Sequence, residues 1–250
     1  MAMQAAVDAG EPVHSRIGFH RTGYMLPRDR DIYASAPLRQ LLDEQARAMA
    51  AVLQRCSGTH ALLVSASTLD APPALPMLGS WVRLWAQGGR YDGDLRAATD
   101  EALPFVDDAF ELVLLRHSLE VVVLAADLLA EAVRVLAPGG VLVVTGVHPI
   151  SAWAPWFCWR ARGAHRAMQM PMRLRRRLRQ AGLEIERVQR VGRSWPRVGG
   201  ARPGEAMGGG YVLLARKRRR ASTPLRIKSV PLRVPVNSQL SPGSRRHATP

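Results

Sequence analysis

Basic and imidazole side chains follow two apolar runs of the kind that forms buried strands. Arg116 and His117 come directly after ELVLL (111–115), and His148 follows VLVVT (141–145). In a sheet of parallel strands, ligands bind beyond the carboxyl ends of the strands, where these three residues stand. A histidine there is suited to act as a general base near neutral pH. Each histidine has a structural alternative, as a capping or packing residue.

Small and hydroxyl-bearing residues follow another apolar run, HALLVS (60–65). Ser65 and Ser67 flank Ala66, so this turn predicts either hydroxyl contacts with a ligand or an ordinary turn of small residues. The sequence has no Walker motif and no G-x-S-x-G motif, so ATPase and hydrolase functions have no residue to support them. No H-x-x-x-H and no Cys/His pair stands at ligand spacing, so no metal site is predicted.

Aromatic and arginine residues gather after the 141–145 run. The aromatic residues are Trp153, Trp156, Phe157 and Trp159, and the arginines among and after them are Arg160, Arg162 and Arg166. This segment could form a wall over a flat or apolar substrate, contact nucleic-acid bases and phosphates, or pack against the sheet edge. The residue types leave these three alternatives open.

Positive charge is concentrated in two segments. The chain has 35 Lys and Arg against 20 Asp and Glu, a formal net charge of +15. Residues 160–202 contain thirteen arginines and two glutamates, while residues 217–250 contain nine basic residues and no acidic one. Both segments suit either solvated surface or a patch for nucleic acid or an anionic lipid surface. The proline and serine content of the second segment predicts a disordered basic tail over 218–250.

Alternating strands and helices must position the candidate residues. Apolar runs predict strands, and apolar residues at three- and four-residue spacing predict helices. The predicted strands are 60–65, 81–85, 111–115, 141–145, 183–191 and 211–215, and the predicted helices are 35–53, 124–136 and 172–181. Three prolines in 70–79 exclude a long regular helix directly after the 60–65 strand. This order is typical of an α/β fold with a largely parallel sheet.

Two longer stretches resemble a known family. GDLRAATDEALPFVDDAFELVLLRHSLE (93–120) and LLAEAVRVLAPGGVLVVTG (128–146) resemble the middle of class I S-adenosylmethionine-dependent methyltransferases of the type 11 kind. The resemblance covers roughly 35–217 and is tight only in 93–146. It implies a Rossmann-like class I methyltransferase fold, mostly parallel with a C-terminal antiparallel strand. It also implies an enzyme that uses S-adenosyl-L-methionine as its cofactor.

The resemblance also implies which residues contact the cofactor. They are Ser65, Ala66, Ser67, Asp94, Leu95 and Arg116. The sequence departs from the family at the turn after the first strand, where the family has an acidic residue followed by a glycine-rich turn. Leu63 stands at the acidic place, and Leu69 replaces the third glycine. Asp70 and Asp92 are the nearest carboxylates that could substitute for the missing acidic residues.

The chain is predicted to comprise an irregular segment (1–33), a methyltransferase-like domain (34–217) with an Arg/Trp-rich insert at about 151–171, and the tail (218–250). Two cysteines, no signal-like start and no long apolar stretch predict a cytoplasmic protein without a membrane span. The primary hypothesis is methyl transfer to an unknown small or macromolecular acceptor. The alternative is a catalytically degenerate binding module on the same fold, with nucleic acid as the ligand of its Arg-rich segment and tail. No motif indicates an oligomeric state.

Overall fold

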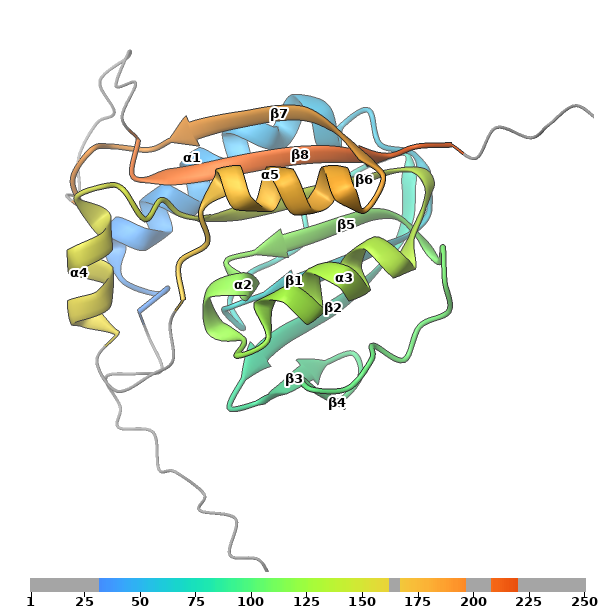
Figure 1. Cartoon of the computed structure of the whole chain (residues 1–250), viewed down its shortest axis with the longest axis horizontal. Helices are drawn as coiled ribbons and strands as arrows, with labels where there is room; N and C mark the ends of the chain where they lie inside the picture. Colours follow the sequence, from blue (N-terminus) through green and yellow to red (C-terminus); the bar gives the residue numbers. More distant parts are fainter. Residues whose placement is uncertain (1–31, 162–166, 197–207, 220–250) are drawn as a thin grey trace, which may run out of the picture. The chain divides into compact units, whose positions relative to one another are not determined.

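The computed structural model describes residues 32–161, 167–196 and 208–219. Their centre is an eight-stranded sheet in the order β4-β3-β2-β1-β5-β6-β8-β7 (Figure 1). The strands are β1 (Gly58–Ser65), β2 (Leu78–Gln87), β3 (Arg90–Gly93), β4 (Ala97–Ala98), β5 (Phe110–Arg116), β6 (Leu136–Val147), β7 (Leu183–Val191) and β8 (Gly210–Lys217). Most of the predicted 1–33 segment, the 220–250 part of the tail, and parts of the insert and the Arg-rich segment lie outside the described residues.

The four central strands are parallel, as the short apolar runs predict. β1 pairs in parallel with β2 and β5, and β5 pairs in parallel with β6. β8 runs antiparallel to β6 and β7, so the prediction of an antiparallel C-terminal strand is confirmed. The last five residues of β1 and β5 are all buried, because both faces of these strands are covered.

Helices lie on both faces of the sheet (Figure 1). They are α1 (Ala36–Leu53), α2 (Ser118–Val121), α3 (Ala125–Val135), α4 (Trp153–Arg160) and α5 (Pro171–Gln180). Met49 and Leu53 of α1 pack on one face, whereas Leu128 of α3 and Leu174 of α5 pack on the other. None of the helices in the described ranges is both long and apolar enough to cross a membrane.

Two boundaries differ from the sequence prediction. β6 begins at Leu136, so Pro138, Gly139 and Gly140 lie inside the strand and do not form a separate break before it. The first half of the insert forms α4, which the apolar spacing did not reveal because aromatic residues occupy several sides of the helix. The predicted helix 35–53 is confirmed as α1, with Ser35 at its N-cap position and Pro37 in its first turn.

The connection between β1 and β2 contains no helix. Residues 66–77 pass from one parallel strand to the next as turns and irregular backbone, consistent with the three prolines in this segment. As a result, β2 has no connecting helix over its α1 side. Arg83 is exposed there, and Trp81 and Trp85 are half-buried. The carboxyl ends of β1 and β5 are therefore covered by a loop and by α1.

Candidate active site

Four residues form a row across the carboxyl ends of the central strands. Trp85 pairs with Ser65, and Arg116 pairs with Thr145. Val64 pairs with Leu115, so Ser65 and Arg116 are neighbours at the next position of the same ladder. Side chains alternate along a strand, and the residues two positions before Ser65 and Arg116 pack in the α1-side core. The row therefore faces the α1 side of the sheet, where the connection after β1 also lies.

Asp70 joins the two strand ends. The Ser65 hydroxyl donates a hydrogen bond to Oδ2 of Asp70. The other carboxylate oxygen, Oδ1, lies 3.6 Å from Nη1 of Arg116, and both side chains are only 10% exposed. We call Ser65, Asp70 and Arg116 the strand-end cluster. Ser65 and Arg116 were predicted as site residues from the sequence, but nothing in the sequence indicated that Asp70 contacts both of them.

The serines of the turn satisfy the turn's own backbone. The Ser67 amide donates to the Ser65 hydroxyl at 3.1 Å, and the Leu69 amide donates to the Ser67 hydroxyl at 3.2 Å. The Ala66 amide donates to the Arg116 carbonyl at 3.0 Å, which ties the turn to β5. In the family a glycine-rich turn occupies this place. Here hydroxyl side chains hold a tight turn by local hydrogen bonds instead.

Arg116 keeps unused hydrogen-bonding capacity. Its Nε atom is buried and has no partner among the described residues. A guanidinium has five N–H donors in a fixed fork and stays charged, so an unpaired donor in a nearly buried position is costly. A small pocket of about 180 Å³ lies against it, between α1 and residues 71–75. The strand-end cluster thus contains a cation that is suited to bind an additional anionic group.

His117 lies inside the protein and away from the mouth of the site. It is 1% exposed and has the left-handed conformation, with φ of 55°. Its Nδ1 lies 2.9 Å from Oε2 of Glu120, and its Nε2 lies 2.9 Å from Oε1 of Gln45. The Gln45 amide nitrogen donates to two carbonyls, which fixes its oxygen toward the histidine. Both ring nitrogens are therefore engaged by side chains of the protein, and the structure places His117 in a packing role where we had considered a general base.

Glu120 is the centre of this buried polar cluster. Its Oε1 accepts a 2.5 Å hydrogen bond from the Val147 amide, and its Oε2 accepts one of 3.1 Å from the Tyr33 hydroxyl. Together with the contact to His117, one carboxylate satisfies three donors from three parts of the chain. The cluster links the start of α1, the loop after β5 and the end of β6. Glu120 is only 1% exposed, so its contacts are internal to the protein.

His148 is half-buried beyond the end of β6. Its Nδ1 accepts a hydrogen bond of 3.1 Å from the Ile150 amide. Burial, and then the nearby charge of Arg190, lower the pKa of His148 below its ordinary value. A neutral imidazole that accepts at Nδ1 carries its proton on Nε2. His148 can therefore donate a hydrogen bond through Nε2 in this state, but Nε2 cannot accept a proton.

Asp94 and Leu95 lie apart from the strand-end cluster. The Asp94 carboxylate accepts a hydrogen bond of 2.8 Å from the Arg83 amide, in the middle of β2. Leu95 packs against the core on the opposite, α3 side of the sheet. The reason is topological, since β3 forms an antiparallel hairpin with β2 and carries the chain back from the strand ends. The glycines at 88 and 89, both with positive φ, form that hairpin turn.

No acidic side chain stands at the end of β2 itself. Gln87 is the last residue of this strand, and it is exposed. Asp92, one of the substitutes considered, lies opposite Trp85 on β3. Its carboxylate is 3.3 Å from Arg96 Nε and 3.9 Å from Arg90 Nε. Asp92 is therefore engaged by two exposed arginines.

The aromatic insert packs mostly inward. Trp153 is buried, and its Nε1 donates to the Arg193 carbonyl at 2.8 Å. Trp156 meets it edge to face at 5.7 Å between ring centroids. Phe157 is also buried, whereas Trp159 is 55% exposed. Of the three alternatives, packing accounts for Trp153 and Phe157.

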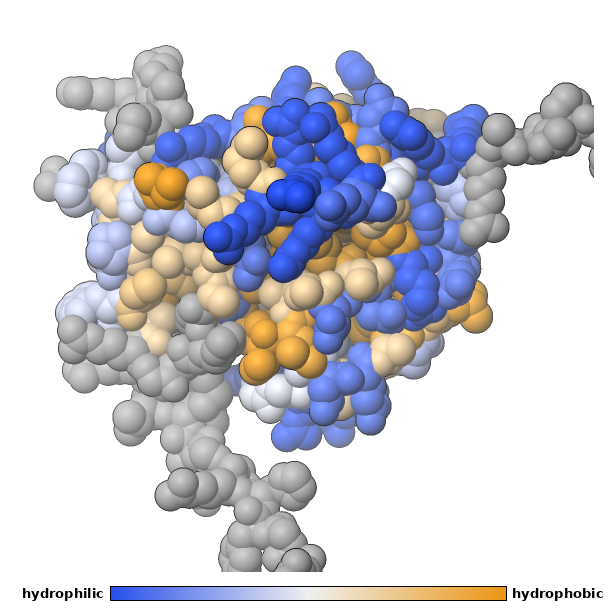
Figure 2. All heavy atoms as spheres, viewed as in Figure 1, coloured by the Kyte–Doolittle hydropathy of each residue, from blue (hydrophilic) through white to orange (hydrophobic). Residues whose placement is uncertain are grey.

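The arginines of α5 face outward. Leu174 and Leu178 are buried, while Arg173, Arg176, Arg177 and Arg179 are exposed. Figure 2 shows hydrophilic side chains gathered over this helix. Among the described residues, none of these arginines has an ion-pair partner. Within the same ranges, no group of three or more His, Cys, Asp or Glu residues could hold a metal ion.

A protein-family comparison matches the part of the chain that contains Arg116. The profile of the type 11 family described as "Methyltransferase domain" matches residues 79–144. These residues run from β2 through β5 and α3 into β6, which are the elements that carry Arg116 and its neighbours. Residues 79–144 are a methyltransferase domain of the type 11 kind. No curated protein matches the chain.

Several solved structures of methyltransferases align with this chain. An S-adenosylmethionine-dependent methyltransferase from Thermotoga maritima, named as a possible histamine N-methyltransferase, has a TM-score of 0.50 and 18% identity. The match covers 72% of this chain and 91% of that one. A methyltransferase from Bacillus halodurans has a TM-score of 0.48 and 19% identity, covering 70% of this chain and 99% of that one. A Haloferax volcanii methyltransferase, solved with its activator Trm112, has a TM-score of 0.48 and 14% identity, covering 77% and 98%.

The fold prediction is thus confirmed, and the family prediction is confirmed over residues 79–144. The sheet is mostly parallel with an antiparallel C-terminal strand, and its fold is the class I methyltransferase fold. The family match over residues 79–144 indicates methyl transfer as the activity. The strand-end cluster lies where ligands bind in such sheets.

Proposed function

We propose that the strand-end cluster holds the amino-acid part of S-adenosylmethionine, with Arg116 binding its carboxylate. The observation that carries this proposal is the contact between Arg116 and Asp70. A carboxylate already lies beside the guanidinium, at 3.6 Å from Nη1, and Nε is still unpaired. A cofactor carboxylate would replace Asp70 and use the donors that Asp70 leaves free. Bidentate contacts of this kind favour arginine over other cations.

The donor set fits the cofactor at this end of the site. Ser65, Ala66 and Ser67 are small, and the serine hydroxyls lie beside the end of β1. The adjacent pocket of about 180 Å³ is below the range of about 300–1,000 Å³ that is usual for ligand sites. Binding therefore requires the 66–77 connection to move away from α1. Such a movement would break the ion pair between Asp70 and Arg116.

The chemistry asks little of the protein beyond position. The bound cofactor supplies a methyl group on a sulfonium, and the residues around it orient the acceptor and exclude water. His148 would contribute a hydrogen bond from Nε2 to the acceptor, since its Nδ1 is occupied by the Ile150 amide. An acceptor that is already deprotonated needs no base from the chain.

Calorimetric titration with S-adenosylmethionine and S-adenosylhomocysteine tests the proposal. We expect the unmodified chain to bind both, and Arg116→Gln to weaken both by more than about tenfold. The matched control is Arg83→Gln, which changes an exposed arginine on the same face. Equal affinity of the unmodified chain and the Arg116→Gln variant would contradict the role of Arg116. Absence of binding to the unmodified chain would contradict the cofactor site.

We also propose that the protein works in the cytoplasm. Cys56 is buried and Cys158 is exposed, and both are free thiols. Unpaired cysteines, one of them at the surface, suit a reducing compartment. Cell fractionation with an antibody to the chain tests this proposal, since recovery outside the cytoplasmic fraction would contradict it.

A further inference from the structure

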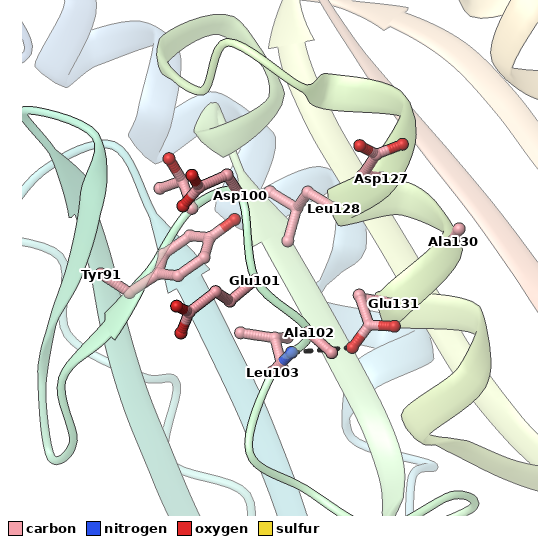
Figure 3. Close-up of a pocket in the computed structure, with 10 residues that line it drawn as sticks. Tyr91, Asp100, Glu101, Ala102, Leu103, Asp127, Leu128, Ala130 and Glu131 are labelled. Carbon is pink, nitrogen blue, oxygen red and sulfur yellow. Dashed lines mark hydrogen bonds between the residues drawn. The ribbon is translucent and has the colours of Figure 1, made fainter.

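A pocket separate from the strand-end cluster lies on the other face of the sheet. Its volume is about 280 Å³, and it is formed by β3, the segment 99–103 and α3. Figure 3 shows the residues around it. Tyr91 pairs with Ala86 of β2 and belongs to the α3-side core, whereas Arg116 faces α1. The sheet therefore separates this pocket from the proposed cofactor site.

Three unpaired carboxylates surround the pocket. Asp100 and Glu101 come from the segment before β5, and Asp127 comes from the first turn of α3. All three are exposed, and none has an ion-pair partner among the described residues. A fourth carboxylate, Glu131, accepts hydrogen bonds from Arg134 and from the Leu103 amide. The Arg134 hydrogen bond lowers the pKa of Glu131, so this carboxylate is ionised as well.

The hydroxyl of the nearly buried Tyr91 is the second and independent feature of the pocket. Tyr91 is only 2% exposed, yet its hydroxyl has no hydrogen-bond partner among the described residues. Figure 3 shows its ring between Asp100 and Glu101, with the hydroxyl directed toward Leu128. The ring is buried while Tyr91 lines the pocket, so the hydroxyl is free to hydrogen-bond with water or with a ligand there. Burial raises the pKa of Tyr91, so the group stays a neutral phenol.

The remaining walls are mostly apolar. Leu103, Leu128, Ala102 and Ala130 provide them, together with Thr99. These side chains suit methylene groups, whereas the carboxylates and the phenol ring suit cationic nitrogen, through charge and through the π-face of the ring. A single metal ion does not fit, because no group of three acidic, His or Cys side chains within the described ranges is close enough to hold one. The charges are spread around the pocket instead.

We infer that this pocket binds a small aliphatic diammonium ion. Its two cationic ends would pair with the separated carboxylates, its methylene chain would contact Leu128, and one ammonium would donate to the Tyr91 hydroxyl. The inference does not depend on the proposed cofactor site, because the two sites use different residues on opposite faces of the sheet.

Calorimetry with 1,4-diaminobutane at low salt tests this inference. We expect Glu101→Gln to weaken binding by about tenfold and Tyr91→Phe by about fivefold. The control Glu184→Gln makes the same change on β7, at the opposite edge of the sheet, and should leave affinity unchanged. Tyr91→Phe should also leave the melting temperature of the free protein unchanged or slightly higher, because the hydroxyl it removes has no partner within the described residues.

A titration with Mg²⁺ distinguishes a pocket that is specific for diamines from nonspecific attraction of cations to the carboxylates. We expect Mg²⁺ to bind much more weakly than the diamine. Equal affinity for Mg²⁺, no diamine binding at millimolar concentration, or an equal loss in the Glu184→Gln control would each overturn the inference. Diamine affinity that survives Tyr91→Phe unchanged would also overturn it, since the Tyr91 hydroxyl would then have no part in binding.

Discussion

Asp70 and Arg116 form a nearly buried ion pair between the turn after β1 and the end of β5, with 3.6 Å between Oδ1 and Nη1. The two residues are 46 positions apart, and the register of two parallel strands brings them together. In this arrangement Asp70 pairs with the Arg116 guanidinium, which is the group that we propose binds the cofactor carboxylate. Cofactor binding and the internal ion pair therefore compete for Arg116.

Asp70→Asn should raise the affinity for S-adenosylhomocysteine. The substitution keeps a hydrogen-bond acceptor for Ser65 but removes the charge that competes for Arg116. We expect a gain of about three- to tenfold by calorimetry, with a lower melting temperature because Arg116 loses its partner. The control Asp43→Asn, on the exposed side of α1, should change neither quantity. A loss of affinity in Asp70→Asn would show that Asp70 itself holds the ligand.

Ser67→Gly should leave cofactor affinity intact or improve it, because glycine removes a side chain from the turn where a ligand would approach. It should lower the free energy of unfolding by about 0.5–1 kcal/mol through the greater freedom of the unfolded chain. Chemical denaturation and calorimetry measure the two effects. Strong loss of binding in this variant would show that the Ser67 hydroxyl contacts the ligand.

Asp94→Ala distinguishes the family expectation from the observed hairpin. The family places this residue at the cofactor, but here its carboxylate accepts from the Arg83 amide at 2.8 Å. We expect a loss of about 1 kcal/mol in the free energy of unfolding and little change in cofactor affinity. A large loss of affinity with unchanged stability would restore Asp94 to the site.

Glu120→Ala should be strongly destabilising. The substitution leaves the Val147 amide, the Tyr33 hydroxyl and the His117 ring without their shared acceptor. We expect a loss of about 3–5 kcal/mol in the free energy of unfolding, against about 2 kcal/mol for Glu120→Gln, which keeps one acceptor. The exposed control Glu184→Gln should stay within about 0.5 kcal/mol of the unmodified chain. Similar small losses in all three variants would contradict the central role of Glu120.

His148 should make stability fall on mild acidification. Its pKa in the folded chain is below the ordinary value of 6.5, so the unfolded chain takes up the proton first as the pH falls. The stabilising contribution is complete above about pH 6.5 and is lost as the pH falls through the folded-state pKa. His148→Asn should therefore lose less melting temperature than the unmodified chain between about pH 7.5 and pH 5. His60→Asn, at an exposed histidine, is the control, and identical pH profiles for all three proteins would contradict the assignment.

Replacing Arg175, Arg176 and Arg177 together by Gln should change stability by less than about 0.5 kcal/mol, because Leu174 and Leu178 carry the packing of α5. We expect the slope of log affinity for duplex DNA against log salt to stay the same, as for a solvated face. A smaller slope would instead support the alternative that α5 contacts phosphates, since each neutralised phosphate contributes about −0.9.

Local patterns were enough to predict the central strands and the three longest helices, but not β3, β4, α2 or α4. Apolar runs such as 60–65 and 111–115 bury both faces of a strand, and the spacing of leucines in 35–53 needs only one buried side of a helix. The alternation of these elements then leads to a parallel sheet. The motifs in 93–146 added the family resemblance, which the match over 79–144 confirms.

The site depended on contacts that no local pattern contains. Nothing in the sequence near Asp70 indicates that its carboxylate reaches Arg116, and nothing near His117 indicates that Gln45 and Glu120 enclose it. The hairpin at 88–89 turned β3 back along β2 and moved Asp94 away from the strand ends. The sequence by itself determined the central strands, the longer helices and the family resemblance, because periodicity and short motifs are properties of neighbouring residues. Only the tertiary structure decided which side chains face a ligand, because strand register and side-chain burial are set by residues far apart in the chain.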